Sequence, residues 1–169
     1  MTRDSKEWAD WLTADFARGL LRYDEQDGCL YYRKNGHLVR AGDKAGYIHN
    51  GYASVNIKGR NFRAHVLIWL IKTGALPTAT IDHVDRDRSN NRWDNLRLAT
   101  RHDQHGNMPI RRDNSSGVRG VSREGNRWKA QIRRDGKKIH IGYFADVASA
   151  KAAYDAAAKQ YFGEFYNHG

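Results

Sequence analysis

Apolar residues near the start of the chain recur at the spacing of one helical face. The series consists of Trp8, Trp11, Leu12, Phe16 and Leu20. This periodicity predicts an amphipathic helix over residues 5–21, with Ser5 as its N-cap. A second apolar run over residues 65–73 stops at Gly74, with Pro77 just beyond, and predicts a short buried helix.

Between these helices the pattern changes to short alternating segments separated by turn residues. The turns carry Asp-Gly, Asn-Gly and Lys-Gly pairs, which favour tight reversals of the chain. We expect strands at 29–33, 52–57 and 61–64. Residues 21–64 therefore predict a small antiparallel sheet.

The C-terminal part also contains short strand-like segments next to a helical segment. Three short strand-like runs at 117–122, 128–134 and 138–144 precede an alanine-rich helix over 147–161, which Asp146 can cap. The polar, basic and proline-containing stretch before them has the composition of a linker. The sequence thus predicts an α+β protein with three parts, which are residues 1–108, a linker at 109–116, and a small three-stranded antiparallel sheet plus helix at 117–169.

Residues 80–107 combine two short strands with an unusually polar loop. The strands are expected at 80–84 and 96–99, and Thr100 with Asp103 forms a capping pair for a helix that starts at Arg101. This order of strand, strand and helix places the end of the first strand beside the new helix.

Charge narrows the choice of partner. The 169 residues carry a formal net charge of +10, which favours polyanions. No apolar run approaches the length of roughly 18–20 residues needed to span a bilayer, so we expect no membrane span. A single cysteine, Cys29, excludes an internal disulfide and a CxxC zinc site, and the first residues lack the features of a secretory signal. We therefore expect a cytoplasmic protein.

Asp82 and His83 stand side by side at the end of the first strand of the polar segment. A carboxylate oxygen is a hard ligand that suits Mg2+, and a neutral imidazole can take a proton from water near neutral pH. Hydrolysis of a phosphodiester needs both functions, so this pair is the leading catalytic candidate. Asp85 and Asp87 could add ligands, but Ser89 breaks the pattern of a calcium-binding loop.

The segment IDHVDRDRSNNRWDNLRLAT resembles the HNH nucleases encoded in phage genomes and phage introns, many of which are homing endonucleases. Upstream, AGDKAGYIHNGYASVNIKGRNFRAHVLIWLIKTGALP is similar to the sheet and helix that precede the motif in those proteins. The resemblance implies a ββα-metal fold, one divalent cation such as Mg2+ or Mn2+, and a phage-encoded enzyme in the host cytoplasm.

The same resemblance assigns roles to individual residues. It implies that His83 is the general base, that Asp82 is a metal ligand, and that Asn95 holds the active-site loop and orients the base. The family's second ligand, Asn or His, falls here on Gln104. Gln104 can still offer a carbonyl oxygen, and His105 or Asn107 could take its place if the helix is shifted in register.

Two further sets of residues in this region have more than one interpretation. His65 matches a histidine that these relatives carry before the buried helix, and it could contact the scissile phosphate or serve only as a structural side chain. Asn90, Asn91 and Asp94 are expected to shape the loop, because Asn and Asp bond their own backbone in turns.

The C-terminal segment SSGVRGVSREGNRWKAQIRRDGKKIHIGYF resembles the ethylene-response-factor or APETALA DNA-binding domain. In that family the sheet lies in the major groove of DNA, which can admit β-strands. The resemblance implies contacts to DNA from Arg119, Ser122, Arg123, Gln131, Arg133, Lys138 and His140. The alternative is that these cations only form a solvated hairpin face.

Together these patterns predict a metal-dependent endonuclease that acts on double-stranded DNA, prefers certain sites and nicks one strand. We expect a monomer with no small-molecule cofactor. One alternative is a non-catalytic DNA-binding regulator on an HNH scaffold whose metal site has decayed at Gln104. Another is an RNA-binding module, which would prefer single strands or stem-loops.

Overall fold

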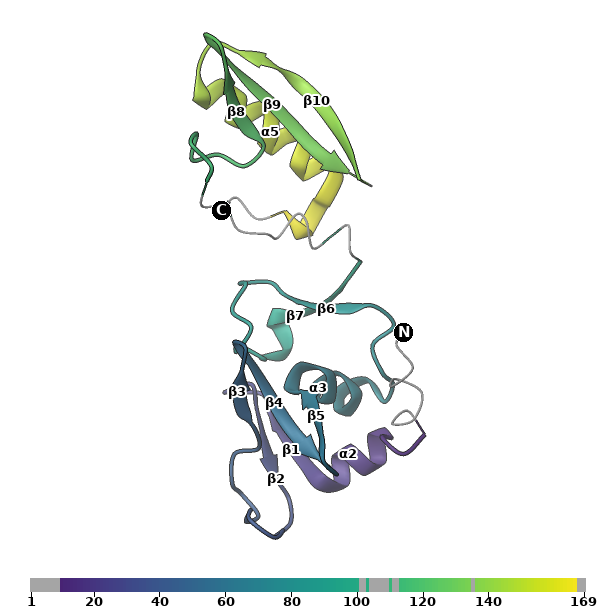
Figure 1. Cartoon of the computed structure of the whole chain (residues 1–169). Helices are drawn as coiled ribbons and strands as arrows, with labels where there is room; N and C mark the ends of the chain where they lie inside the picture. The colour runs from purple at the N-terminus through teal and green to yellow at the C-terminus, as the bar shows by residue number, and fades with distance from the viewer. Residues whose placement is uncertain (1–9, 101–102, 104–109, 111–112, 135, 167–169) are drawn as a thin grey trace. The chain divides into compact units, whose positions relative to one another are not determined.

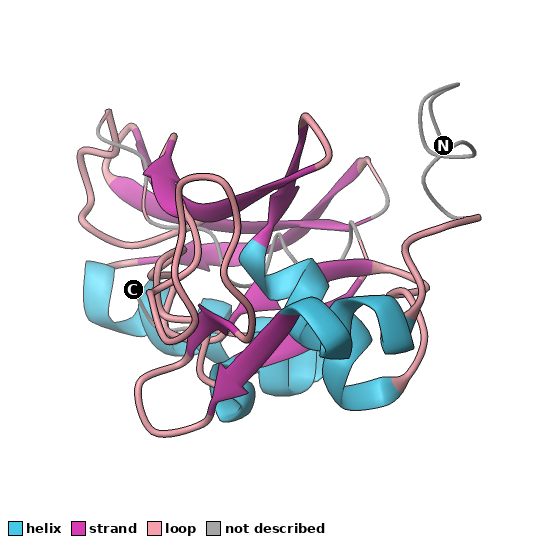
Figure 2. Ribbon diagram, turned by 90° about the horizontal axis from the view of Figure 1, so that it is seen from below, coloured by secondary structure: helices cyan, strands magenta, loops and turns pink. Residues whose placement is uncertain are grey.

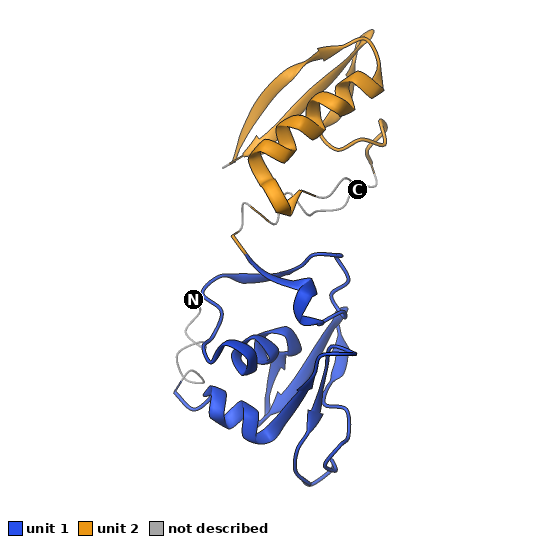
Figure 3. Ribbon diagram, turned by 180° about the vertical axis from the view of Figure 1, so that it is seen from behind, with its two compact units in different colours: residues 1–98 blue, residues 99–169 orange. Residues whose placement is uncertain are grey.

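The structure is a computed structural model that describes residues 10–100, 103, 110, 113–134 and 136–166. The chain divides into two compact units, residues 1–98 and residues 99–169 (Figures 1 and 3). This division falls ahead of the linker predicted at 109–116. Each unit is described by itself below.

Both units mix helices with small sheets (Figure 2). The described residues of unit 1 form two α-helices, one 3-10 turn and three small sheets. Its elements in chain order are α2 (Ala14–Leu20), β1 (Leu21–Asp24), β2 (Cys29–Tyr32), β3 (Tyr47–His49), β4 (Tyr52–Ile57), β5 (Arg60–Arg63), α3 (Ala64–Thr73), β6 (Thr80–His83), η1 (Trp93–Asn95) and β7 (Leu96–Ala99). β1 pairs with β2, β3 pairs with β4 and β4 with β5, all antiparallel, and β6 pairs with β7.

The first helix differs from its prediction. α2 begins at Ala14, and the hydroxyl of Thr13 caps it by accepting a hydrogen bond from the Phe16 amide at 3.1 Å. A helix start after Ser5 falls outside the described residues. Trp11 and Leu12 precede α2, yet Leu12 is buried in the core. Apolar spacing alone therefore extended the predicted helix beyond the residue that caps it.

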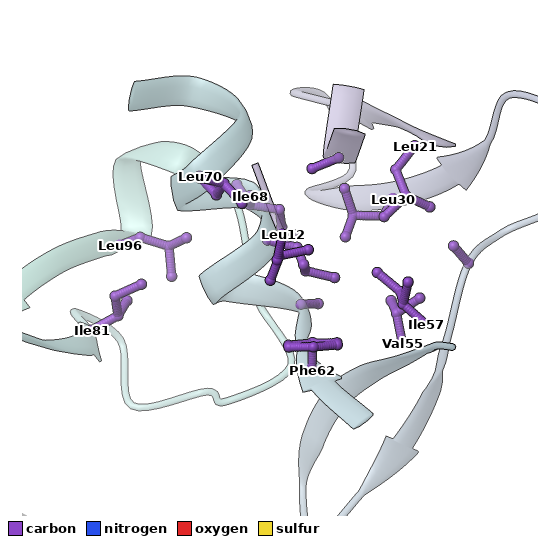
Figure 4. Packing of buried hydrophobic residues seen from close by; sticks show 14 residues of the cluster. Leu12, Leu21, Leu30, Val55, Ile57, Phe62, Ile68, Leu70, Ile81 and Leu96 are labelled. Carbon is purple, nitrogen blue, oxygen red and sulfur yellow. The ribbon is translucent and has the colours of Figure 1, made fainter. Parts of the chain in front are cut away.

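α3 lies at the centre of unit 1. Figure 4 shows its buried side chains between those of β1 and β2 on one side and those of β6 and β7 on the other. The cluster includes Leu21, Leu30, Ile68, Leu70 and Leu96. As predicted, the helix ends at Gly74, which has the left-handed φ of 81° that glycine accepts without strain.

The β6–β7 segment is anchored to α3 through aromatic packing. The ring centroids of Trp69 in α3 and Trp93 in η1 are 5.1 Å apart. Beyond β7, the Asp103 carboxylate accepts hydrogen bonds from the amide and hydroxyl of Thr100 at 2.8 and 2.7 Å, which confirms the predicted capping pair. Asp103 is helical, and the residues around it lie outside the described ones.

The described residues of unit 2 form a three-stranded antiparallel sheet on which α5 packs (Figure 3). Its elements are β8 (Val121–Glu124), β9 (Arg127–Arg134), β10 (Lys137–Phe144), α5 (Val147–Phe162) and η2 (Gly163–Phe165). The Asp146 carboxylate caps α5 by accepting from the Ser149 amide at 2.8 Å, as the sequence predicts. Ala130, Ile132, Ala150 and Tyr154 form the centre of its core.

The expectation of an α+β protein built from small antiparallel sheets and few helices is confirmed at this level. β1 and β3 were not predicted, because each is only three or four residues long and β1 follows directly on the apolar run of the preceding helix. In the part of the chain that the structure describes, no helix is long and apolar enough to cross a membrane.

Candidate active site

His83 is the last residue of β6 and its side chain is buried, with 5% exposure. Side chains alternate along a strand, so His83 lies on the same side as the buried Ile81 and on the other side from Asp82. The histidine therefore faces the interior of unit 1, where a neutral imidazole needs a defined hydrogen-bond partner.

Asn91 provides that partner. Its side-chain oxygen lies 3.1 Å from Nε2 of His83, and its amide nitrogen donates to the Ser89 carbonyl at 3.1 Å. The second bond fixes which end of the Asn91 amide faces the histidine, because a carbonyl can only accept. Nε2 of His83 therefore donates, and in the neutral ring the lone pair resides on Nδ1.

Asn95 holds the loop that follows His83. Its Oδ1 accepts from the Asp85 amide at 3.0 Å, and its Nδ2 donates to the Asp85 carboxylate at 2.9 Å and to the Asn90 carbonyl at 2.8 Å. Burial would raise the pKa of Asp85, but hydrogen bonds from Asn90 and Asn95 lower it below its usual value. Asp85 is thus held as a carboxylate within the loop.

His65, at the start of α3, stands beside His83. The two imidazole centroids are 5.2 Å apart, and the Tyr52 ring lies 5.6 Å from His65 and 6.3 Å from His83. Burial, followed by the nearby His83 and Arg63, lowers the pKa of His65 to about 4. Within the described residues, its buried Nδ1 has no hydrogen-bond partner. His65 is therefore neutral near pH 7.

Two guanidinium groups flank the Tyr52 ring. Arg63 lies 4.3 Å and Arg88 5.0 Å from the ring centroid, both within the range of cation–π contacts. Arg63 also donates to the His49 carbonyl at 2.9 Å, which fixes its position. Two positively charged groups thus lie against the aromatic ring next to His83, and such an arrangement can bind a phosphate anion.

Asp82 makes a different contact from the one expected for a metal ligand. Its Oδ2 accepts from Nε and Nη2 of Arg97 at 3.1 and 3.0 Å, and both side chains are only 15% exposed. A carboxylate in this position has the chemistry of a hard divalent-cation ligand, and here a guanidinium cation binds it.

The other predicted ligands cannot be compared in the same way. Gln104, His105 and Asn107 lie outside the described residues. Among the described residues, there is no group of three or more His, Cys, Asp or Glu side chains that could hold a metal. One carboxylate fits a divalent cation in its chemistry, but these residues alone do not build a complete site.

The sheet of unit 2 presents a second candidate surface. Its exposed face is opposite the one covered by α5, and residues directly across from each other in register share it. The register pairs Gln131 with His140 and Arg133 with Lys138. We call this surface the outer sheet face, and it comprises Ser122, Glu124, Arg127, Lys129, Gln131, Arg133, Lys138, His140 and Tyr143.

Five of the seven predicted DNA contacts lie on the outer sheet face, and two do not. Arg123 pairs with Trp128 on the other face, and its guanidinium lies 5.7 Å from the Trp128 ring centroid. Arg119 precedes β8, and its Nε is buried. It lies close to Tyr154 of α5, where its positive charge opposes the rise in the pKa of Tyr154 that burial causes. Neither side chain belongs to the outer sheet face, although Arg123 is exposed and also donates to the Gly125 carbonyl at 3.2 Å.

Asn91 and the pair of arginines around Tyr52 were missed from the sequence. Asn91 stands among Ser and Asn residues that typically form turns, so nothing in the pattern distinguishes it. Arg63 and Arg88 belong to a chain rich in cations, and only the fold brings them to one aromatic ring. The spacing of eight residues between His83 and Asn91 is the one available signal, because a loop that returns to its strand can place them together.

Comparison with known proteins agrees with the location of this site. Residues 62–105 match the HNH endonuclease family, and this segment includes His65, Asp82, His83, Asn95 and Gln104. The chain is 34% identical over 79 residues to Protein 3.8 of Escherichia phage T7, which covers 45% of this chain and 65% of that protein.

A second relative is an uncharacterized HNH endonuclease of Acanthamoeba polyphaga mimivirus. It is 34% identical over 97 residues, which are 57% of this chain and 50% of the relative. The chain thus aligns with 65% and 50% of the lengths of these two proteins. No solved structure matches the chain at a significant level. The family match and the name of the mimivirus relative support a nuclease.

Proposed function

We propose that this protein is a metal-dependent endonuclease that hydrolyses phosphodiester bonds in duplex DNA. The observation that carries the proposal is the buried, hydrogen-bonded His83 near a tyrosine ring that two arginines contact, inside the segment that matches the HNH endonuclease family. A positioned base near cations that can bind the phosphate is what hydrolysis of a phosphodiester requires.

In this mechanism the residues of unit 1 divide the work. Arg63 and Arg88 bind the scissile phosphate, and His83 accepts a proton from a water molecule as its oxygen attacks phosphorus. The bond from phosphorus to the 3′ oxygen then breaks, and the departing oxygen takes a proton from solvent. Neutral His65 fills the space beside His83 without adding a competing positive charge.

The metal proposal rests on Asp82. Asp82 would bind one Mg2+ or Mn2+ together with Gln104, His105 or Asn107, and the cation would neutralise charge on the phosphate and on the leaving oxygen. This proposal includes the ββα-metal arrangement, in which the helix after β7 supplies the second ligand. Because Arg97 binds the same carboxylate, loading of the ion requires that this ion pair opens or shares its oxygen atoms.

Unit 2 is proposed to hold the DNA. The outer sheet face carries Lys129, Arg133 and Lys138, and among the described residues of the sheet Glu124 offsets part of this charge through an ion pair of 2.9 Å with Lys129. We therefore propose a DNA-binding domain of the ethylene-response-factor type. One catalytic centre per chain favours a monomer that nicks one strand at preferred sites, in the manner of a homing endonuclease.

The test is a cleavage assay on supercoiled plasmid with Mg2+ or Mn2+, comparing wild type with His83→Ala. We expect nicked plasmid from wild type and a rate about 100- to 10,000-fold lower from the variant, because the general base is lost. Equal rates would remove His83 from the mechanism. Binding of duplex without cleavage by any divalent ion would favour the non-catalytic regulator, and preference for RNA stem-loops would favour the RNA-binding module.

A further inference from the structure

The loop residue Asn91 has contacts that a simple turn former does not need. Its side chain is buried, with 3% exposure, and both ends of its amide are engaged. One end faces the imidazole of His83 and the other is bound to the Ser89 carbonyl. A buried amide with both ends fixed can hold a neighbouring ring in one orientation.

The backbone of Asn91 is held in turn by the β1–β2 hairpin. The hydroxyl of Tyr23 in β1 donates to the Asn91 carbonyl at 3.1 Å. The guanidinium of Arg92 donates to the Gln26 carbonyl at 2.9 Å. Both bonds join residues more than 60 positions apart, so the hairpin fixes where residues 91 and 92 lie.

Gly28, in the turn of this hairpin, shows how close the contact is. A Cβ atom at position 28 would lie 2.6 Å from the Arg92 amide nitrogen and 2.9 Å from the Asn91 carbonyl carbon. Real Cβ atoms do not approach backbone this closely, so any larger residue would push residues 91 and 92 away. The hairpin therefore packs directly against the backbone of Asn91.

We propose that Asn91 is a positioning residue for His83, and that the β1–β2 hairpin is the support that keeps Asn91 in place. Oδ1 of Asn91 accepts a hydrogen bond from Nε2–H of His83, so that Nδ1 is left to act as the base. This role rests on the proposed function of His83, but the hydrogen bond itself is a property of the protein without DNA. Asn95 shapes the same loop, while Asn91 contacts the ring.

The first measurement is NMR of the full-length 15N-labelled protein without DNA. We expect an exchange-protected Nε2–H resonance that is absent from His83→Ala. Asn91→Leu, which keeps the size of the side chain but removes the acceptor, should abolish this protection. Asn91→Asp retains an acceptor oxygen and should keep the resonance. Protection that persists in a folded Asn91→Leu protein would overturn the proposal.

The second measurement is cleavage of supercoiled plasmid by the same proteins. We expect Asn91→Leu to lower kcat about 10- to 100-fold with KM unchanged, as found when a residue supporting a catalytic group is lost. Asn91→Asp should fall between Asn91→Leu and wild type. An equal loss in both variants, with the Nε2–H proton protected in Asn91→Asp, would contradict the positioning role.

Gly28→Ala tests the hairpin without touching the site. Its matched control is Gly59→Ala, because Gly59 has a similar φ of 78° but no atom within 4 Å of an added Cβ, against 71° at Gly28. We expect Gly28→Ala to weaken protection of the His83 Nε2–H and to lower kcat, while Gly59→Ala does neither. Identical behaviour of the two variants would remove the hairpin from the account.

These outcomes separate the two proposals. If wild type does not cleave DNA but Asn91→Leu loses the protected proton, the proposed function fails and the positioning of His83 stands. If wild type cleaves and Asn91→Leu changes neither the proton nor kcat, the positioning role fails and the nuclease stands.

Discussion

The two units place their candidate functional residues in opposite environments. In unit 1, His65, His83 and Asn95 are buried, each at 8% exposure or less. In unit 2, Arg133, Lys138 and His140 are exposed on the outer sheet face. Proton transfer needs a side chain held in one position, whereas binding of a polyanion needs cations that reach solvent. This difference supports the proposal that unit 1 cuts the duplex and unit 2 holds it.

The largest expected effect is the unfolding of unit 2 while unit 1 stays folded, which tests whether the two units are independent. A Cβ at Gly120 would lie 2.2 Å from the Tyr154 ring and 2.4 Å from the Gln131 carbonyl oxygen. Gly120→Ala should therefore destabilise unit 2 by about 3 kcal/mol or more through overpacking and backbone strain. Hydrogen exchange should show lost protection over 121–162 and retained protection over 54–73.

Gly117→Ala is the matched control for that variant. Gly117 has nearly the same φ, 67° against 68° at Gly120, but no atom lies within 4 Å of an added Cβ. It should show only the smaller cost of a left-handed alanine, about 1 kcal/mol. Loss of protection in both units of Gly120→Ala would show that the two cores do not fold independently.

Acid should destabilise unit 1 through His65. Its pKa is about 4 in the folded protein against the ordinary histidine value of 6.5, so the unfolded chain binds the extra proton first as the pH falls. The stability is fully present above pH 6.5 and is lost as pH falls from 6.5 to 4, by up to about 3 kcal/mol.

The measurement is urea unfolding followed by tryptophan fluorescence, since every tryptophan except Trp128 lies in residues 1–98. His65→Phe should flatten the dependence on pH over this range, and His37→Gln, in the exposed loop after β2, should not. An unchanged slope in His65→Phe would show that another group governs the acid sensitivity of unit 1.

The smallest expected effect is a change in the salt dependence of DNA binding, and it tests the role of the outer sheet face. Replacing Arg133 and Lys138 together by alanine should reduce the slope of log binding constant against log salt concentration by about 0.9 for each phosphate contact removed. Lys159→Ala, on the exposed side of α5, is the control. A fluorescence anisotropy titration of labelled duplex at several salt concentrations measures this. The same slope in all three proteins would move DNA binding away from this face.

The sequence predicted most elements because local signals defined them. Gly74 and Asp146 mark helix ends that the structure reproduces, and β4 and β7 match their predicted ranges. The exact start of α2 was wrong because Thr13 caps the helix after the apolar pattern has already begun. The ends of an element can thus be predicted from the sequence where a residue type has one structural role.

Contacts between distant segments could not be predicted in this way. The bond between Tyr23 and Asn91 joins residues 68 positions apart, and the ion pair between Asp82 and Arg97 depends on the pairing of β6 with β7. Arg119 and Arg123 are basic like their neighbours, yet the fold directs them toward Tyr154 and Trp128. Charge and spacing identify candidates, and tertiary packing decides which of them meet.

The central claim is that unit 1 cuts through His83 while unit 2 only holds the duplex. The most direct measurement is the single-turnover rate of plasmid nicking at saturating protein, for wild type, His83→Ala and the double variant Arg133→Ala with Lys138→Ala. The account predicts that saturation restores the wild-type rate in the double variant and leaves His83→Ala slower by about 100-fold or more. Nicking by His83→Ala at the wild-type rate would contradict it.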